Sequence, residues 1–182
     1  MKIFKLLCVF TVIFKCCLAQ KVVRYYYETS DVSAKNETSP AFGKLQNFST
    51  VRTYMNDSQF KETRLFTFDN NKSISYRIVN QKWYYKNNKK WKLFYDSYRR
   101  KGGVVYLRDG AYEVVFDKQI TIQGKILHKL FFKPIKIFQS HKLAYYFDPK
   151  FGVVIIQNSA GSVLLRTNYL IKKLNENELD SL

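Results

Sequence analysis

The stretch KLAYYFDPKFGVVIIQNSAGSVLLRT, residues 142–167, decides the fold class. Within it, residues 143–147 alternate between two faces, residues 153–156 (VVII) are apolar at every position, and DPKFG and NSAG separate the runs. Period-2 alternation in β-branched and aromatic residues, interrupted by Pro, Gly and Asn, is typical of an antiparallel meander. A strand that is apolar on both faces must be covered on both, so we expect residues 153–156 to form the central strand of the core.

Outward from this stretch, short apolar and aromatic runs continue toward the N-terminus, separated by turn signals such as NQ at 80–81 and NNK at 87–89. Closely spaced turns are typical of sandwiches and barrels, and no run keeps a helical period for three turns. We therefore expect an all-β fold, mainly an antiparallel meander, that forms a sandwich or a partly open barrel. Residues 29–50 lack periodicity, which predicts a long loop. Residues 168–182 are expected to form a short C-terminal helix or to fray.

The clearest local pattern is VVYLRDGAYEVVF at 104–116, two alternating runs joined by Asp109-Gly110. This pair is the preferred one for a type I′ hairpin turn, because both central residues must adopt positive φ. A turn centred there pairs Leu107 with Tyr112 across the hairpin. The residues then expected to share the core face are Val105, Leu107, Tyr112, Val114 and Phe116.

The N-terminus has the layout of a secretory signal peptide. Lys2 and Lys5 precede a short apolar run at residues 6–14 (LLCVFTVIF), and small residues at Cys17 and Ala19 suit cleavage before residue 20. At about 1.5 Å per residue, this run is too short to cross a hydrocarbon core of about 30 Å. We therefore expect removal of residues 1–19, export of a single β-rich domain spanning 20–182, and no transmembrane segment after the signal is removed.

All three cysteines, Cys8, Cys16 and Cys17, fall inside the predicted signal peptide. The mature chain would then have no disulfide, no thiolate nucleophile and no cysteine-ligated metal. Small exported domains that lack a large core depend on disulfides, whereas this one must depend on burial of its many aromatic side chains. A cysteine-free exported chain favours the periplasm or the cell surface.

The chain is strongly basic, with a formal charge of +17 that falls to +14 when Lys2, Lys5 and Lys15 leave with the signal peptide. A net charge this far from zero attracts anionic partners and surfaces. Outside the cell, the expected partners are anionic polysaccharide, lipid head groups or an acidic protein, and nucleic acid is not expected.

Catalytic patterns are absent from the sequence: it contains no H-E-x-x-H, G-x-S-x-G, P-loop or G-x-G-x-x-G motif. The two histidines, His128 and His141, are too few and too poorly spaced for a metal site, so one is expected in the core and one at the surface. Asp109, Asp117 and Asp148 stand where turns favour Asp. No catalytic residue, metal or cofactor is predicted.

The most suggestive stretch for binding is KWYYKNNKKWKLFYDSYRRK at 82–101, where aromatic residues interleave with eight basic residues and one acid. Aromatic rings beside cations can stack on sugars and hold anionic groups. The candidate binding residues are Lys82, Trp83, Lys86, Lys89, Lys90, Trp91, Lys92, Arg99 and Arg100.

Alternation alone accounts for much of the same pattern, and this structural reading stays open. In it, the lysines only solvate the outer side of a hairpin and protect the sheet edge from aggregation. The inward side of that hairpin would consist of Trp83, Tyr85, Trp91, Leu93 and Tyr95.

Two functions fit these observations. The first is an exported, non-catalytic protein that binds an anionic partner or surface in the periplasm or at the cell surface. The alternative is a periplasmic carrier that holds a lipid or other apolar ligand in a barrel-like cavity.

Overall fold

The computed structural model describes residues 20–29, 47–65, 72–107, 110–135, 143–158, 162–167, 169, 174, 177–178 and 182, and the structural statements below concern these residues. They form thirteen β-strands. The strands are β1 (Val22–Thr29), β2 (Phe48–Asn56), β3 (Gln59–Leu65), β4 (Lys72–Val79), β5 (Lys82–Asn87), β6 (Lys90–Asp96), β7 (Lys101–Gly102), β8 (Val104–Leu107), β9 (Gly110–Ile122), β10 (Lys125–Pro134), β11 (Leu143–Asp148), β12 (Gly152–Asn158) and β13 (Val163–Arg166).

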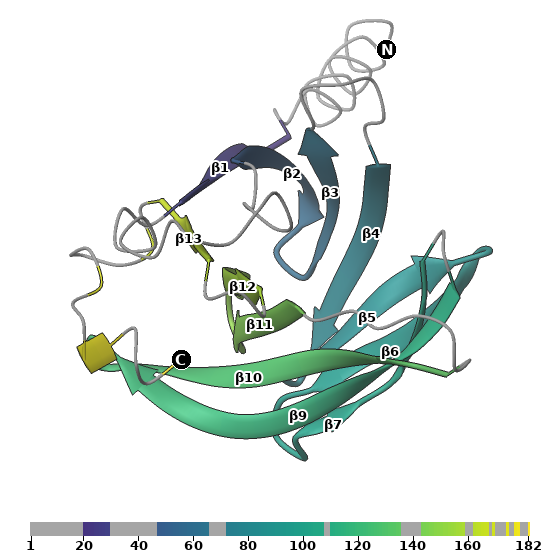
Figure 1. Cartoon of the computed structure of the whole chain (residues 1–182). Coiled ribbons are helices and arrows are strands. Elements are labelled where there is room, and N and C mark those ends of the chain that lie inside the picture. The colour runs from purple at the N-terminus through teal and green to yellow at the C-terminus, as the bar shows by residue number, and fades with distance from the viewer. Residues whose placement is uncertain are drawn as a thin grey trace, which may run out of the picture.

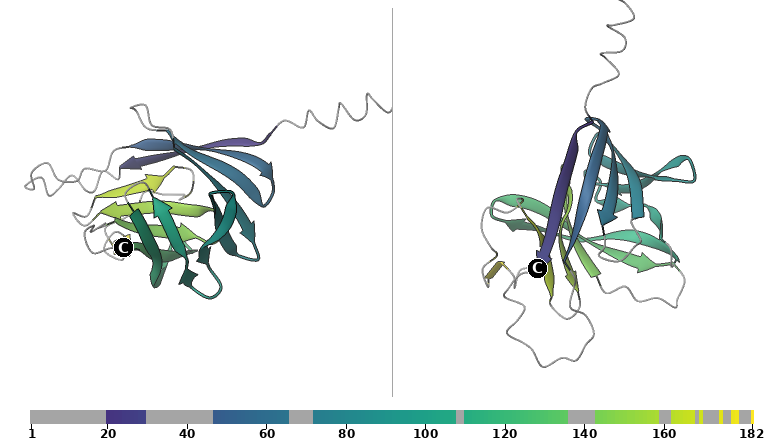
Figure 2. Two further views of the ribbon diagram at one scale, coloured as in Figure 1. Left: turned by 90° about the vertical axis from the view of Figure 1, so that its right-hand side faces the viewer. Right: turned by 90° about the horizontal axis from the view of Figure 1, so that it is seen from above.

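One antiparallel sheet contains all of these strands, in the order β7-β6-β5-β4-β3-β2-β1-β13-β12-β11-β10-β9-β8. Neighbours in the sheet are neighbours in the chain, except that β1 pairs with β13 and so joins the two ends of the described meander. The sheet curls into a nearly closed barrel (Figure 1), and Figure 2 shows its curvature from two further directions. The all-β, antiparallel prediction is confirmed, and the architecture is barrel-like.

The barrel approaches closure at Gly103, where one extended segment is divided between the two ends of the sheet. Before Gly103, β7 pairs with β6; after it, β8 pairs with β9. The amide of Gly103 donates to the carbonyl of Phe94 at 3.0 Å, and its own carbonyl accepts from the amide of Val114 at 3.0 Å. Beyond this point the hydroxyl of Tyr85 donates to the carbonyl of Val104 at 2.9 Å, so a side chain occupies part of the edge of β8.

Strand β12 is buried on both faces, as its apolar sequence predicted. Ile156 points to the inner face, where it packs with Tyr27 and Leu164. Ile155 points to the outer face and belongs to a separate cluster. That cluster includes Tyr169, Leu174 and Leu182 from the C-terminal segment, packed against Ile120, Ile122, Leu127, Ala144, Tyr146, Val154, Ile155 and Val163. The C-terminal segment thus supplies the second cover, although β1 rather than β12 is the middle strand of the order.

Aromatic rings from opposite walls meet inside the barrel between β4–β6 and β10–β11. The ring of Trp83 on β5 lies 5.0 Å from that of Phe147 on β11, measured between centroids. Phe94 on β6 lies 6.2 Å from Phe132 on β10 and 5.9 Å from Phe147. Edge-to-face and tilted ring contacts at these separations add to the burial of large apolar surfaces. Side chains therefore fill this part of the interior.

The predicted register of the 104–116 hairpin is wrong by two residues. Tyr112 pairs with Val105, and Gly110 belongs to β9 opposite Leu107, so the turn is centred one residue earlier than Asp109-Gly110. Asp109 itself lies outside the described residues. A shift of two leaves the alternation in phase, and the burial of Val105, Tyr112 and Val114 is confirmed.

Two further expectations concern the loop at 29–50 and the C-terminal segment at 168–182. The loop expected at 29–50 is too long at its C-terminal end, because β2 begins at Phe48 and pairs with β1. Residues 30–46 lie outside the described residues, as does most of the segment 168–182 for which a helix was expected.

The near-closure at Gly103 makes a direct prediction for stability. A Cβ added to Gly103 would lie 2.0 Å from the carbonyl oxygen of Leu93, a backbone atom fixed in the sheet. Gly103→Ala should therefore lower the free energy of unfolding by about 3 kcal/mol or more, measured by urea denaturation. Gly124→Ala is the control: its φ is +73° but nothing lies within 4 Å, so its loss should be about 1 kcal/mol. Equal losses in the two variants would contradict the closure argument.

Candidate functional site

The basic aromatic stretch forms the β5–β6 hairpin, and its turn determines which side chains point outward. Asn88 and Lys89 both have positive φ, 46° and 65°, as a type I′ turn requires. The two-residue turn pairs Lys86 with Trp91. Because paired residues share a face, Trp91 lies on the outer face of the sheet with Lys86.

The structure separates the predicted binding residues into three groups. Lys86, Lys89, Lys90 and Trp91 gather at the turn end of the hairpin, where all three lysines are exposed. Lys82, Arg99 and Arg100 lie at the opposite end; Lys82 is ion-paired with Asp96 at 3.6 Å, and Arg100 donates to Gln119 at 3.1 Å. Lys92 lies at the edge next to β8, with its Nζ 4.2 Å from the ring centroid of Tyr106.

Trp83 must be removed from the predicted binding surface. It points into the barrel with only 2% of its surface exposed, and its indole N–H donates to the carbonyl of Pro149 at 2.8 Å. The structural reading of the same hairpin is also wrong in part, because it placed Trp91 and Leu93 on the inward side. Tyr95 does point inward, since a register shift between Trp83 and Tyr84 moves it to the inner face.

On the outer face of β4–β6, an arginine lies between two aromatic rings. The guanidinium carbon of Arg77 is 5.4 Å from the ring centroid of Tyr84 and 5.0 Å from that of Trp91. Sequence reasoning identified the neighbouring lysines but missed Arg77, because it belongs to the preceding strand. Among the described strand residues of this face on β3–β6, the basic side chains are Lys61, Arg77, Lys82 and Lys86, and Asp96 is the one carboxylate.

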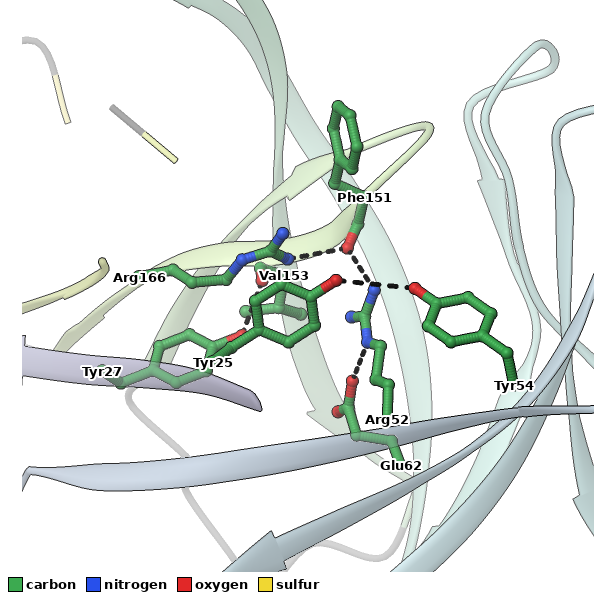
Figure 3. Close-up of polar contacts among 8 residues, drawn as sticks. All are labelled: Tyr25, Tyr27, Arg52, Tyr54, Glu62, Phe151, Val153 and Arg166. Atoms are coloured by element: carbon green, nitrogen blue, oxygen red, sulfur yellow. Dashed lines mark hydrogen bonds and ion pairs between the residues drawn. The ribbon is translucent and has the colours of Figure 1, made fainter. Parts of the chain in front are cut away.

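A second cluster of charge lies on the inner face, and nothing in the sequence reasoning anticipated it (Figure 3). Arg52 and Arg166 are buried, with 4% and 5% of their surfaces exposed. Their Nη1 atoms donate to the same carbonyl oxygen, that of Phe151, at 2.8 and 2.9 Å. The Nε atom of Arg52 also donates to Glu62 at 2.5 Å. The only signal in the sequence is a charged residue at an inward position of an alternating strand.

The surroundings of this cluster shift the pKa values of Arg52 and Tyr27. Burial opposes the charge on Arg52, but the charge and hydrogen bond of Glu62, together with the hydroxyls of Tyr27 and Tyr54, outweigh it and hold the pKa of Arg52 above its ordinary value. Burial, reinforced by Glu62, raises the pKa of Tyr27 to about 12. Both groups therefore keep one protonation state at any physiological pH: Arg52 is charged and Tyr27 is neutral.

The turn between β11 and β12 is fastened across the interior by these side chains. Besides the bonds from Arg52, Arg166 and Trp83, the hydroxyl of Tyr27 donates to the carbonyl of Val153 at 2.7 Å. The carboxylate of Asp148 accepts from the amide of Lys150 at 2.7 Å, which confirms Asp148 as a turn former. Donors from β2, β5 and β13 thus converge on one short turn, and a donor from β1 binds the start of β12 directly after it.

Of the two histidines, His128 is among the described residues. His128 is 5% exposed, and its Nδ1 lies 2.8 Å from the hydroxyl of Tyr95, so it is a core residue as predicted. His141 lies outside the described residues. In the described ranges, no three His, Cys, Asp or Glu side chains are placed to hold a metal ion.

Comparison with known proteins adds no relative. No family model, no curated protein and no solved structure matches the chain. Among the residues that the structure describes, no helix is long and apolar enough to span a membrane. The fold and the two clusters are therefore the basis for inferring the protein's function.

Burial of His128 predicts a pH dependence of stability. Burial, with a contribution from Arg100, lowers the pKa of His128, so the unfolded chain takes up a proton at higher pH than the folded one. Stability should fall as the pH drops through about 6.5, with a slope of at most about 1.4 kcal/mol per pH unit from this group. Urea denaturation between neutral pH and about pH 5.5 measures it.

His128→Gln should flatten that slope, whereas His141→Gln serves as the control for the other histidine. If the slope is the same in wild type and His128→Gln, burial of His128 does not govern the acid sensitivity.

Proposed function

We propose that this is an exported, non-catalytic protein that binds an anionic partner or surface in the periplasm or at the cell surface. The expected partners are glycans, lipid head groups or acidic proteins. The contact surface consists of Arg77, Lys86, Lys89, Lys90 and Trp91, and we call it the hairpin surface.

The observation that carries this proposal is the imbalance of charge around Trp91. The described strand residues of the outer face on β3–β6 carry four basic groups, and the one carboxylate, Asp96, is already paired with Lys82. Cations that have no anionic neighbour and lie beside aromatic rings can bind an anionic group while a ring stacks on an adjoining sugar or apolar part. Lys89 in the turn and Lys90, which pairs with Asn87 and so lies on the opposite face of the hairpin, continue the basic charge around its tip.

The carrier alternative receives less support. It requires an incompletely filled barrel, whereas ring contacts such as that between Trp83 and Phe147 cross the interior from wall to wall. Because side chains fill the barrel interior between β5 and β11, contact at the surface is favoured over binding of an apolar ligand inside.

Export belongs to the same proposal and has its own test. The signal-peptide layout predicts that the mature protein begins at residue 20 and forms one β-rich domain. Intact mass of the protein recovered from outside the cytoplasm should match residues 20–182. A retained N-terminus, or an added mass the size of a lipid, would contradict soluble export.

Charge reversal tests the hairpin surface. Lys89→Glu combined with Lys90→Glu should weaken binding to vesicles containing phosphatidylglycerol or to a sulfated polysaccharide by tenfold or more, because it moves the local charge by four units. Wild-type binding should weaken from low to physiological salt, since exposed charges are screened beyond about 8 Å at 0.15 M. Co-sedimentation and affinity chromatography measure these effects.

The matched control is Arg24→Glu with Lys118→Glu, an equal charge change on exposed residues of β1 and β9. It should leave more binding than the hairpin variant. Trp91→Ala should weaken binding with little loss of stability, because Trp91 is on the outer face. If the hairpin reversal leaves fold and binding to every anionic surface unchanged, the hairpin is only a solvated edge and the carrier becomes the better proposal.

A further inference from the structure

The interior next to β1–β3 and β13 differs from the aromatic interior described above. Two buried guanidinium groups face it, those of Arg52 and Arg166, and Glu62 is the one carboxylate that the described residues of these strands place among them. Arg52 donates to Glu62 at 2.5 Å and shares the carbonyl of Phe151 with Arg166, so these three charges lie in one interior region. Among the described residues of these strands, two buried cations therefore face a single carboxylate.

Two buried polar atoms of this region have no hydrogen-bond partner among the described residues: the Nε of Arg166 and the Oγ1 of Thr50. Thr50 is 1% exposed and pairs directly with Tyr25 across β1 and β2. The guanidinium carbon of Arg166 lies 3.9 Å from the ring centroid of Tyr25. Both unsatisfied atoms thus belong to residues that flank the same tyrosine (Figure 3 shows Tyr25 and Arg166).

Leaving such atoms unsatisfied is unfavourable. A buried donor that loses its acceptor costs about 1–3 kcal/mol, and more when it is charged. The remaining bond of Arg166, to the carbonyl of Phe151, does not neutralise its charge, and the carboxylate of Glu62 is bonded to Arg52. An oxyanion satisfies both needs, because its oxygens accept from a guanidinium and a hydroxyl and its charge balances the second arginine.

We propose that this region, which we call the Tyr25 site, binds the oxyanion of a small ligand, a carboxylate or a phosphate group, between Arg166 and Thr50. Tyr25 and Tyr54 are only partly buried, with their hydroxyls 3.5 Å apart, so the site borders the surface there. Lys21 is exposed at this border, with its Nζ 5.5 Å from the ring centroid of Tyr54, and attracts anions to the entrance. The Tyr25 site is separate from the hairpin surface and does not depend on it.

Thermal unfolding of the full mature protein tests the site, with sodium phosphate, sodium acetate and sodium chloride compared at equal ionic strength. Phosphate or acetate should raise the midpoint saturably relative to chloride, and the more effective anion identifies the chemistry of the ligand. Arg166→Gln should weaken the fitted affinity by about tenfold or more, equivalent to about 1.4 kcal/mol.

Arg24→Gln is the matched control, because it removes an arginine that is exposed on β1 and belongs to neither proposed site. It should retain the wild-type response to anions. The Lys89→Glu, Lys90→Glu protein should retain it too, so that failure of the hairpin surface and failure of the Tyr25 site can be told apart.

Thr50→Val provides a second variant in case Arg166→Gln does not fold. Removing an unsatisfied hydroxyl should raise the midpoint in chloride, while the response to phosphate or acetate falls several-fold because one donor is lost. If neither anion shifts the wild-type midpoint beyond chloride, water alone satisfies these atoms and the proposal is overturned. It is equally overturned if every variant that folds keeps the wild-type response.

Discussion

The carbonyl oxygen of Phe151 accepts hydrogen bonds from two buried arginines that come from β2 and β13. Since β1 lies between these two strands in the sheet, the shared acceptor ties both neighbours of β1 to the turn that joins β11 and β12. A neutral oxygen between two like charges is stable only where other groups compensate. Glu62 does so for Arg52, and the aromatic face of Tyr25 partly does so for Arg166.

The second constraint is steric and acts at the other side of the barrel. Gly102 and Gly103 let three backbone segments approach so closely that an added Cβ would overlap a carbonyl oxygen at either position. The chain can therefore turn from its pairing with β6 to its pairing with β9 within a single residue. In the sequence these glycines follow YRRK and resemble an ordinary polar break, since nothing local distinguishes a turn from a point of sheet closure.

Alternation predicted the faces of most strands better than their pairing. The 104–116 hairpin kept its buried face despite a register error of two, because the side-chain period is also two. Alternation did not predict the irregularities in strand pairing. The register shift at Trp83/Tyr84 and the one between His128 and Leu130 each change which residues point inward. The Tyr25 site was equally hidden, because Thr50, Arg52 and Arg166 come to lie beside Tyr25 only after β1 has paired with both β2 and β13.

The two basic clusters differ physically, although both would be counted together in the net charge. Charges on the hairpin surface are solvated, so their attraction reaches about one Debye length and contributes little to folding. Arg52 and Arg166 are withdrawn from water, where a charge interacts strongly over short distances and where an apolar core of similar volume is often as stable or more so. Packing alone does not require two arginines at these positions. The aromatic clusters on the neighbouring strands show that this barrel can fill its interior without charge. The buried arginines beside Tyr25 are therefore not explained by the stability of the core.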